Sequence, residues 1–304
     1  MNWKKFLAEY HLLKSGLEDY QNTNIILFKI ITLILRGETQ PELILSWATS
    51  PIELTQLVSD DLAAELSAAQ SLDAESLYLI IGHWIQLMPQ EATLLGEVYE
   101  KLAIGHRVRG LYYTPPAVID FILLHTVEHC DIVVNPKVKV LDPACGCGYF
   151  LLKAYDILLL KFRQSRAIMI EKYPNEDWSD EGIHRHIIQY NLWGADIDQV
   201  AGDIATVSLL LKRQDSNHGL QPNIIVCDSL KRSEDTAVTG KERAFWAARY
   251  HYVVGNPPYL SFGLRGTRSM DIQYKEYLRQ TYGAAEYKLS YYVLFMQRGI
   301  EMLV

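Results

Sequence analysis

Hydrophobic residues in the first third of the chain recur at the spacing that is typical of α-helices. The pattern begins at Leu7, Tyr10, His11 and Leu17 and continues at Ile25, Phe28, Leu33 and Leu35. Later helices are predicted to begin at Ser50-Pro51, Ser71 and Pro89-Gln90, since Ser and Pro favour the first positions of a helix. No segment with the features of a strand interrupts this region. Residues 1–105 are therefore predicted to form a helical domain.

Beyond Gly110 the pattern changes to short apolar runs that alternate with helical segments. Strands are predicted at residues 138–141, 192–195, 224–227 and 252–255. Helices are predicted at residues 116–128, 148–173, 199–212, 241–248 and 291–303. Such alternation indicates a parallel, doubly wound α/β sheet that binds its ligands at the carboxyl ends of the strands. Residues 106–304 are therefore predicted to form a second, α/β domain.

The acidic charge of the chain is concentrated in its helical region. The whole chain has a formal net charge of −7, and residues 1–105 carry 6 Lys and Arg against 14 Asp and Glu. The other residues carry 23 against 22, a net charge of +1. An evenly acidic chain would argue against a nucleic-acid partner, and this distribution does not. It does not predict a strongly basic face either.

Neither a membrane span nor a disulfide framework is predicted. The longest apolar stretch, residues 25–35, is interrupted by Lys29 and is far shorter than the roughly 20 residues that a span needs. No signal peptide is evident at the N-terminus. The cysteines are Cys130, Cys145, Cys147 and Cys227. Their placement fits a reducing compartment, so we expect a cytoplasmic protein with no membrane partner.

A glycine-rich turn, residues 142–148 (DPACGCG), follows the first predicted strand. Gly146 and Gly148 allow a ligand to approach the backbone closely, and the start of the next helix offers free N–H groups. Asp142 can accept a hydrogen bond from an amino group. Any tight strand-to-helix turn can have this sequence, so the turn by itself leaves a binding role and a structural role equally open.

Acidic residues end the next two predicted strands. Asp196 is expected to accept hydrogen bonds from the two hydroxyls of a ribose, whereas Asp198 is expected to cap the following helix. Ile197 can pack against a purine. Asp228, which precedes Ser229, can accept a hydrogen bond from the exocyclic amine of an adenine. Asp-Ser pairs are also common in surface turns, so this pair alone decides little.

The fourth predicted strand leads into Asn256-Pro257-Pro258-Tyr259. The consecutive prolines keep the carbonyl groups of Asn256 and Pro257 free of helical bonding. Together with the side-chain oxygen of Asn256, the backbone oxygen of Pro257 can accept both hydrogens of one amino group, which frees the nitrogen lone pair for attack. Tyr259 offers a flat face for stacking on a base. The alternative is an edge turn of the sheet with Tyr259 in the core.

The order and spacing of these turns resemble class I S-adenosylmethionine-dependent methyltransferases, specifically the branch that methylates N6 of adenine in DNA. Residues 110–116 (GLYYTPP) are similar to the N-terminal cofactor motif of the γ-ordered enzymes. Residues 95–100 (LGEVYE) resemble the helix that precedes this motif in type IIG restriction–modification and phage-exclusion methylases. The resemblance covers about residues 92–304 and implies a doubly wound, Rossmann-like methyltransferase sheet.

The resemblance also implies roles for individual residues. The implied binding residues for S-adenosylmethionine are Tyr113, Thr114, Pro115, Asp142, Ala144, Cys145, Gly146, Gly148, Asp196, Ile197, Asp228 and Ser229. The implied catalytic residues are Asn256, Pro257, Pro258 and Tyr259, which hold the target adenine and stack on it. The chain departs from the family at Cys147, where Ser is usual, and at Ser290, where Asp is usual.

The implied reaction is direct methyl transfer to N6 of an adenine flipped out of DNA, within a restriction–modification or phage-defence system. Catalysis then depends on the alignment of nitrogen, methyl and sulfur, and no metal is implied. Residues 261–287 are expected to contact DNA phosphates or to form a solvated loop, and their basic residues are Arg265, Arg268, Lys275 and Arg279. His184 and His186, in an expected insertion at residues 171–190, are predicted to face solvent.

The family fold continues with three further strands and a target-recognition domain, so the sheet is expected to be incomplete at its C-terminal side. A separate target-recognition or nuclease chain is the expected partner besides DNA. The exposed edge strand is predicted to favour self-association. Two alternatives remain open: a methyltransferase of protein glutamine or RNA guanine, and a non-catalytic cofactor-binding module acting through the acidic helical domain. The Tyr113-Thr114-Pro115 segment favours DNA as the substrate.

Overall fold

The computed structural model describes residues 3–16, 23–49, 74–87, 91–102, 114–213, 219–232, 240–259, 261–262, 271–285 and 289–304. The helix starts predicted at residues 50–51, 71 and 89–90 lie outside these ranges, as do Tyr113, Arg265 and Arg268. None of the helices in the described ranges combines the length and the hydropathy needed to cross a membrane.

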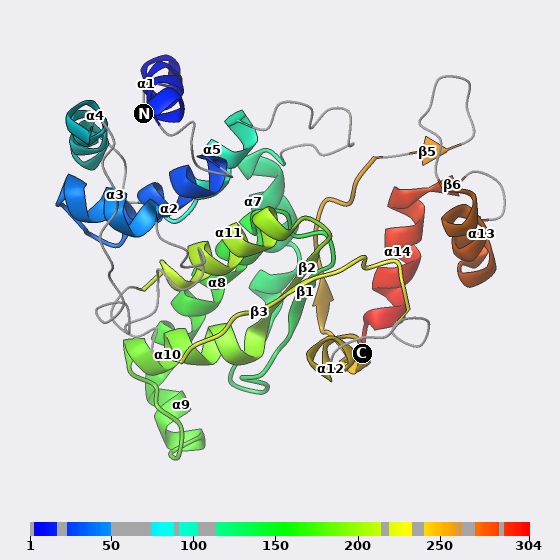
Figure 1. Ribbon diagram of the computed structural model, residues 1–304. Helices are drawn as coiled ribbons and strands as arrows, with labels where there is room; N and C mark the ends of the chain where they lie inside the picture. Colours follow the sequence, from blue (N-terminus) through cyan, green and yellow to red (C-terminus); the bar gives the residue numbers. More distant parts are fainter. Residues whose placement is uncertain are drawn as a thin grey trace.

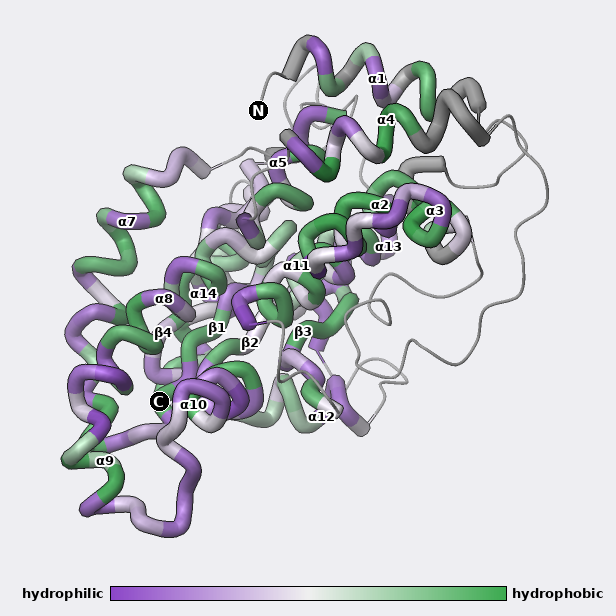
Figure 2. Tube along the Cα trace, turned by 90° about the vertical axis from the view of Figure 1, so that its left-hand side faces the viewer, coloured by the Kyte–Doolittle hydropathy of each residue, from purple (hydrophilic) through white to green (hydrophobic). Residues whose placement is uncertain are grey.

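The N-terminal region is helical, as its hydrophobic spacing predicts. Its helices are α1 (Trp3–Gly16), α2 (Thr23–Leu35), α3 (Pro41–Thr49), α4 (Ala74–Leu87) and α5 (Leu94–Leu102). Helix α2 is hydrophobic on nearly every side (Figure 2) and is buried from Ile26 to Leu35, because α3, α4 and α5 all pack against it. A helix with apolar residues all round is stable in water only when it is covered in this way.

Four parallel strands form the central sheet (Figure 1), in the order β3-β2-β1-β4. They are β1 (Val140–Asp142), β2 (Leu192–Asp196), β3 (Asn223–Val226) and β4 (Tyr252–Val253). Each strand overlaps its predicted run, and the ends differ by no more than two residues. The predicted parallel α/β sheet is therefore confirmed.

Helices cover both faces of this sheet. They are α7 (Pro116–Leu124), α8 (Tyr149–Gln164) and α11 (Gln199–Leu210) on one face, and α12 (Gly240–Ala247) and α14 (Tyr291–Met302) on the other. Successive residues of a strand point to opposite faces. Val140 therefore joins the core under α8 and α11, whereas Leu141 packs with Phe245 and Met302 on the second face.

The sequence-based prediction of solvent-facing His184 and His186 is wrong. Both lie in α10 (Asp180–His186) and are buried, with 0% and 5% of their surface exposed. The Nδ1 atom of His184 lies 2.7 Å from the Tyr155 hydroxyl, and Nε2 of His186 lies 2.9 Å from the Pro136 carbonyl oxygen. These partners explain the burial, because a polar ring can be buried at low cost when it is hydrogen-bonded. Burial also lowers the pKa of His186.

The helix predicted at residues 148–173 is two helices, α8 and α9 (Arg166–Lys172), which meet at Ser165. The helix predicted at residues 116–128 is α7 followed by the 3₁₀ turn η3 (Val127–His129). The π-helix η4 (Ile187–Asn191) follows α10 and leads directly into β2. The apolar residues in the helices predicted at residues 116–128 and 148–173 keep a helical spacing across each break. The pattern alone therefore does not show where one helix ends and the next begins.

A small C-terminal unit lies beside the carboxyl end of β4 (Figure 1). It contains β5 (Ser261–Phe262), α13 (Ile272–Thr281), η5 (Gly283–Ala285) and β6 (Leu289–Ser290), and β5 pairs with β6 in antiparallel fashion. Leu230 packs with Leu278, Tyr282 and Leu294 in a separate hydrophobic cluster. This cluster attaches α13 and α14 to the loop that follows β3, close to the carboxyl ends of the strands.

Candidate cofactor and substrate site

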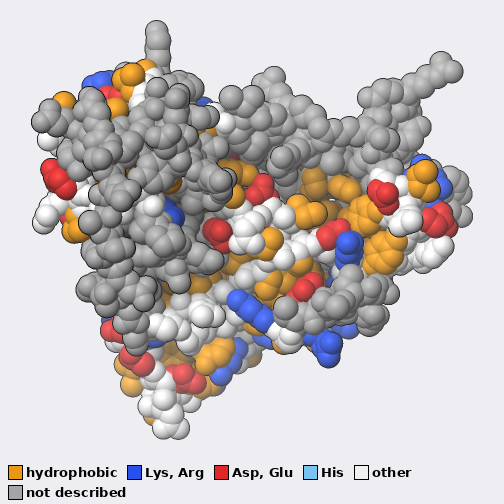
Figure 3. Space-filling view, viewed as in Figure 1, with side chains coloured by type: hydrophobic (Ala, Val, Ile, Leu, Met, Phe, Trp, Pro, Cys, Tyr) orange, Lys and Arg blue, Asp and Glu red, His pale blue; other side chains and the backbone are white. Residues whose placement is uncertain are grey.

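A cavity of about 770 Å³ lies at the carboxyl ends of the central strands. The face shown in Figure 3 is hollowed at its centre, where hydrophobic and acidic side chains gather. The predicted site residues that line the cavity are Thr114, Asp142, Ala144, Cys145, Gly146, Asp196, Ile197, Asp228, Ser229, Asn256, Pro257, Pro258 and Tyr259. Pro115 and Gly148 do not line it, and Tyr113 lies outside the described residues.

The glycine turn adopts the backbone conformation that its sequence requires. Gly146 and Gly148 have φ angles of 51° and 87°, a region that favours glycine. A Cβ atom added to Gly148 would lie 3.0 Å from Cβ of Ala205 in α11, so this glycine allows the turn to pack closely against the helix. A Cβ atom on Gly146 would meet nothing within 4 Å, which is consistent with a backbone that a ligand can approach.

Asp196 and Asp198 have different roles in the structure. Asp198 caps α11, because its Oδ1 atom accepts hydrogen bonds from the Val200 and Ala201 amides, and this part of the prediction is confirmed. Asp196 instead connects two turns: Oδ2 accepts from the Gly146 amide at 2.8 Å, and Oδ1 accepts from the Asp198 amide at 2.9 Å. A carboxylate has about four lone-pair positions, so a ribose hydroxyl can still donate to Asp196.

Asp142 is almost fully buried in the site, with 1% of its surface exposed. Its Oδ1 atom accepts a hydrogen bond from the Ala144 amide at 3.1 Å, and a Cβ atom added to Gly255 would lie only 2.5 Å from the same oxygen. Burial, with a smaller contribution from the nearby Asp196 and against the hydrogen bond from Ala144, raises the pKa of Asp142 to about 8. Asp142 is therefore largely protonated at neutral pH and can donate as well as accept.

This raised pKa makes stability depend on pH. Between the pKa values of the unfolded chain and the folded protein, the folded state binds the extra proton, so raising the pH favours unfolding. We expect this one group to lower the stability by about 2–2.5 kcal/mol between pH 5 and pH 7, close to the limit of roughly 1.4 kcal/mol per pH unit. Chemical denaturation of the wild type and of Asp142→Asn at several pH values measures this. A variant with the same pH dependence as the wild type would contradict a protonated Asp142.

The carboxylate of Asp228 receives two hydrogen bonds from within the protein. Oδ1 accepts from the Leu230 amide at 3.0 Å, and Oδ2 accepts from the Tyr274 hydroxyl at 2.7 Å. Ser229, the next residue, donates from its hydroxyl to the Pro143 carbonyl at 2.6 Å. The turn after β3 is thereby tied to the glycine turn on one side and to α13 on the other.

The turn at residues 256–259 faces the same cavity. Nδ2 of Asn256 donates to the Thr114 hydroxyl at 2.9 Å, which orients the amide and leaves its oxygen as an acceptor. Tyr259 has 56% of its surface exposed, so the alternative that places it in the core is wrong. Its ring lies nearly parallel to that of Tyr292, at 13° and 5.9 Å between centroids. The aromatic ring of this turn is therefore available at the rim of the cavity.

Several residues of the cavity wall were missed by the sequence analysis. They are Tyr99, Glu100, Tyr149, Phe150, Tyr274, Tyr291 and Phe295. Tyr99 and Glu100 lie in the segment 95–100 that the sequence marked by resemblance, without a role. No sequence pattern marked Tyr274 as a site residue, because 46 positions and several elements separate it from its partner Asp228. Within the described residues, no group of three His, Cys, Asp or Glu side chains could hold a metal ion.

The sheet order, the glycine turn and the cavity at the strand ends define a class I methyltransferase fold. Solved structures with this fold include a nuclease-deletion mutant of the type ISP restriction–modification enzyme LlaGI in complex with a DNA substrate mimic. Its TM-score is 0.55 at 17% identity, over 98% of this chain and 26% of that chain. The DNA complex of DrdV has a TM-score of 0.54 at 15% identity, over 98% of this chain and 31% of that one.

Residues 190–304 match the model of the Eco57I restriction-modification methylase family. The adenine-specific methyltransferase PglX of Streptomyces coelicolor is 27% identical over 253 residues, which are 68% of this chain and 19% of that protein. The adenine-specific methyltransferase BrxX of Escherichia coli O9:H4 is 34% identical over 98 residues, 30% of this chain and 7% of that protein. The chain thus corresponds to less than a fifth of the length of either relative.

Proposed function

We propose that this chain transfers a methyl group from S-adenosylmethionine to N6 of an adenine that has been flipped out of DNA. The observation that carries the proposal is that one cavity is lined by both the glycine turn and the turn at residues 256–259. The first suits a nucleoside-containing cofactor and the second suits an amino group on an aromatic ring. Relatives named adenine-specific methyltransferases and DNA-bound structures of the same fold support DNA as the substrate.

The residues of the cavity fit this cofactor. The open backbone at Gly146 and the Asp196 carboxylate suit the methionine portion and the ribose, and the exposed Ile197 suits the purine. Asp228 suits the purine amino group. Tyr113, Thr114, Pro115 and Gly148 complete the proposed cofactor-binding set, the last by packing the turn against α11. When bound, S-adenosylmethionine would supply a methyl group that its sulfonium has already activated.

The chain's own part in catalysis is then to hold the target amine. The Asn256 side-chain oxygen and the Pro257 carbonyl oxygen accept its two hydrogens, which directs the lone pair of the nitrogen toward the methyl donor. Thr114 keeps the amide of Asn256 in the orientation that this requires. Preorganised acceptors need no reorganisation during the reaction, so they stabilise the transition state more than water does. Base flipping costs a few kcal/mol, which stacking on Tyr259 offsets.

Calorimetric titration with S-adenosylmethionine, combined with a methylation assay on DNA of mixed sequence, tests the proposal. The expected result is cofactor binding and the appearance of N6-methyladenine in the DNA. Binding without transfer would favour a non-catalytic module. Transfer to protein or RNA but not to DNA would show a different substrate. We further propose a restriction–modification or phage-defence setting, in which a separate target-recognition or nuclease chain contributes sequence specificity.

The exposed ring of Tyr259 carries a prediction about DNA. Tyr259→Ala should weaken binding of DNA with an unpaired target adenine by about 10-fold or more, because stacking of a base on an aromatic ring contributes roughly 1–3 kcal/mol. Tyr259→Phe keeps the ring and should stay within about 3-fold of the wild type. Fluorescence anisotropy with labelled DNA measures both variants. Equal losses in Ala and Phe would assign the effect to the hydroxyl and contradict stacking.

A further inference from the structure

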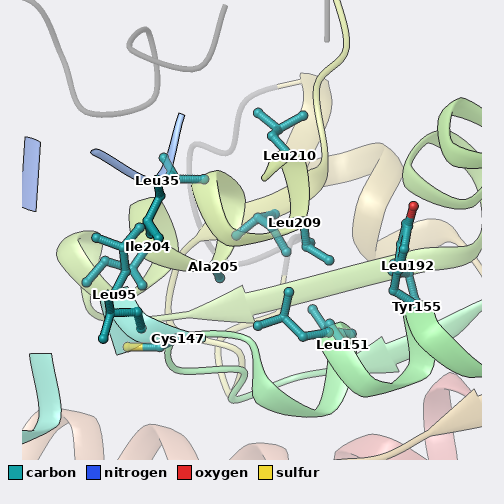
Figure 4. Close-up of a cluster of buried hydrophobic side chains, with 14 of the residues drawn as sticks. Leu35, Leu95, Cys147, Leu151, Tyr155, Leu192, Ile204, Ala205, Leu209 and Leu210 are labelled. Atoms are coloured by element: carbon teal, nitrogen blue, oxygen red, sulfur yellow. The ribbon is translucent and has the colours of Figure 1, made fainter. Parts of the chain in front are cut away.

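Helix α5 of the N-terminal region lies directly on the glycine turn. A Cβ atom added to Gly96 would lie 3.0 Å from Cβ of Cys147 and 2.7 Å from the Tyr149 hydroxyl oxygen. Leu95 belongs to the same buried cluster as Cys147 and Ile204 of α11, and Figure 4 shows these three side chains together. The helical region therefore contributes a wall of the cavity, at the turn that is proposed to bind the methionine portion of the cofactor.

Two residues near the end of α5 reach the cavity. The Tyr99 hydroxyl donates to Oδ2 of Asp198 at 2.7 Å, which ties α5 to the cap of α11. Glu100 follows Gly96 by one helical turn, so both lie on the face of α5 that meets the glycine turn. Its half-buried carboxylate lines the cavity and has no hydrogen bond or ion pair among the described residues.

Two charged residues of α5, Glu97 and Lys101, act directly on Glu100. Asp196 and Asp198 lie at and just after the end of β2 and, like Glu100, act on the Cys147 thiol. Burial raises the pKa of the Cys147 thiol, and Glu100 is the strongest of three carboxylates that raise it further. Glu100 therefore lies close to the glycine turn. Among the described residues that line the cavity there is no Lys, Arg or His to pair with it.

We propose that Glu100 binds the cationic amino group of the amino-acid portion of S-adenosylmethionine. This inference rests on the proposed function and assigns one wall of the cofactor site to the helical region. A carboxylate that is half-buried beside other acids is costly unless a cation joins it, and the ammonium group is the cation that the methionine portion offers. Tyr99 positions α5 for this contact through Asp198. The side chain of Glu97, one helical position after Gly96, does not line the cavity.

The experiment compares three ligands by calorimetric titration. S-adenosylmethionine and S-adenosylhomocysteine carry the amino group, whereas 5′-methylthioadenosine keeps the adenine, ribose and sulfur but lacks the amino-acid portion. Glu100→Gln should bind the first two ligands about 10- to 100-fold more weakly, the range for a lost hydrogen bond between charged groups. Its affinity for 5′-methylthioadenosine should stay within about 2-fold, which also shows that the variant is folded. Glu97→Gln is the matched control and should resemble the wild type.

A second measurement detects the release of a proton when the cofactor binds. Burial and the neighbouring Glu97 raise the pKa of Glu100 to about 7, against the lowering effect of Lys101, so part of the population is protonated at neutral pH. A bound ammonium group lowers this pKa, so binding at pH 7 releases a proton. Titration in two buffers of different ionisation enthalpy should detect greater release in the wild type than in Glu100→Gln. The comparison removes the contribution of Asp142, which also titrates near this pH.

Three outcomes overturn the inference. Equal weakening of all three ligands by Glu100→Gln would mean that Glu100 only shapes the cavity. Unchanged affinity for all three would mean that it makes no contact with the cofactor. If the wild type binds 5′-methylthioadenosine and S-adenosylmethionine but Glu97→Gln loses as much affinity as Glu100→Gln, the effect is one of general charge. Failure of the wild type to bind any of the three would instead contradict the proposed function itself.

Discussion

Asn256→Ala is expected to reduce the rate of methyl transfer by about 100- to 1,000-fold, the effect of removing one preorganised hydrogen-bonding group from a transition state. The substitution removes the side-chain oxygen that is proposed to accept a hydrogen of the adenine amine. It leaves the glycine turn, Asp196 and Asp228 in place, so the affinity for S-adenosylmethionine should stay within about 3-fold of the wild type. Single-turnover methylation with saturating cofactor measures the rate, and calorimetry measures the affinity.

The methylation rate and the cofactor affinity are measured separately in order to test whether Asn256 acts on the target adenine and not on the cofactor. Asn256 also donates to the Thr114 hydroxyl, so Thr114→Val serves as a control that removes this acceptor and keeps the Asn256 oxygen. We expect that variant to lose less activity than Asn256→Ala, because the amide is misoriented only part of the time. If Asn256→Ala loses cofactor affinity in proportion to its rate, Asn256 holds the cofactor and the proposed assignment is wrong.

Gly255→Ala is expected to lower the free energy of unfolding by about 2–3 kcal/mol and to remove most of the activity. Its φ angle is 153°, and an added Cβ atom would lie 2.5 Å from Oδ1 of Asp142 and 3.1 Å from its Cγ. Asp142 is buried and hydrogen-bonded to Ala144, so it has little room to move, and overpacking of this kind costs about 1–3 kcal/mol before backbone strain is added. Movement of the backbone would displace Asn256, and a shift of about 1 Å at a reacting group can cost about 100-fold in rate.

Differential scanning calorimetry and the methylation assay measure the two effects. Gly283→Ala is the matched control, because an added Cβ atom there meets nothing within 4 Å. That control should stay within about 0.5 kcal/mol of the wild type, as is usual for exposed positions. A Gly255→Ala variant with unchanged melting temperature and activity would show that the turn at residues 256–259 does not approach Asp142 as closely as the structure has it.

The local sequence was sufficient to predict the strands, most helices and the turns of the α/β region. The β-branched runs predicted the four strands, and the glycines at 146 and 148 predicted the tight turn between β1 and α8, in which the structure shows positive φ angles. The residues at the strand ends could be named because parallel strands bring their carboxyl ends to one edge of a sheet. These are short-range properties, set by side-chain shape, hydrophobic period and backbone freedom within a few residues.

Contacts between segments that are distant in the sequence could not be predicted from local patterns. The histidines of α10 have no evident partners nearby in the sequence, yet Tyr155 and the Pro136 carbonyl provide partners that make burial favourable. Tyr274 meets Asp228, and Thr114 meets Asn256, although 142 positions separate the second pair. A hydrogen bond depends on the final separation of two atoms, and a pattern along one segment contains no information about the other.

The strands and helices in their order along the chain, the glycine turn and the chemical types of the candidate catalytic residues could thus be inferred from the amino acids alone, because each follows from interactions within a few positions of the chain. The folded arrangement was needed to show that α5 of the acidic helical region forms a wall of the same cavity, with Glu100 beside the glycine turn. The position of that helix results from packing of Leu95 and Gly96 against α11 and the turn, and packing of distant segments is a property of the assembled core.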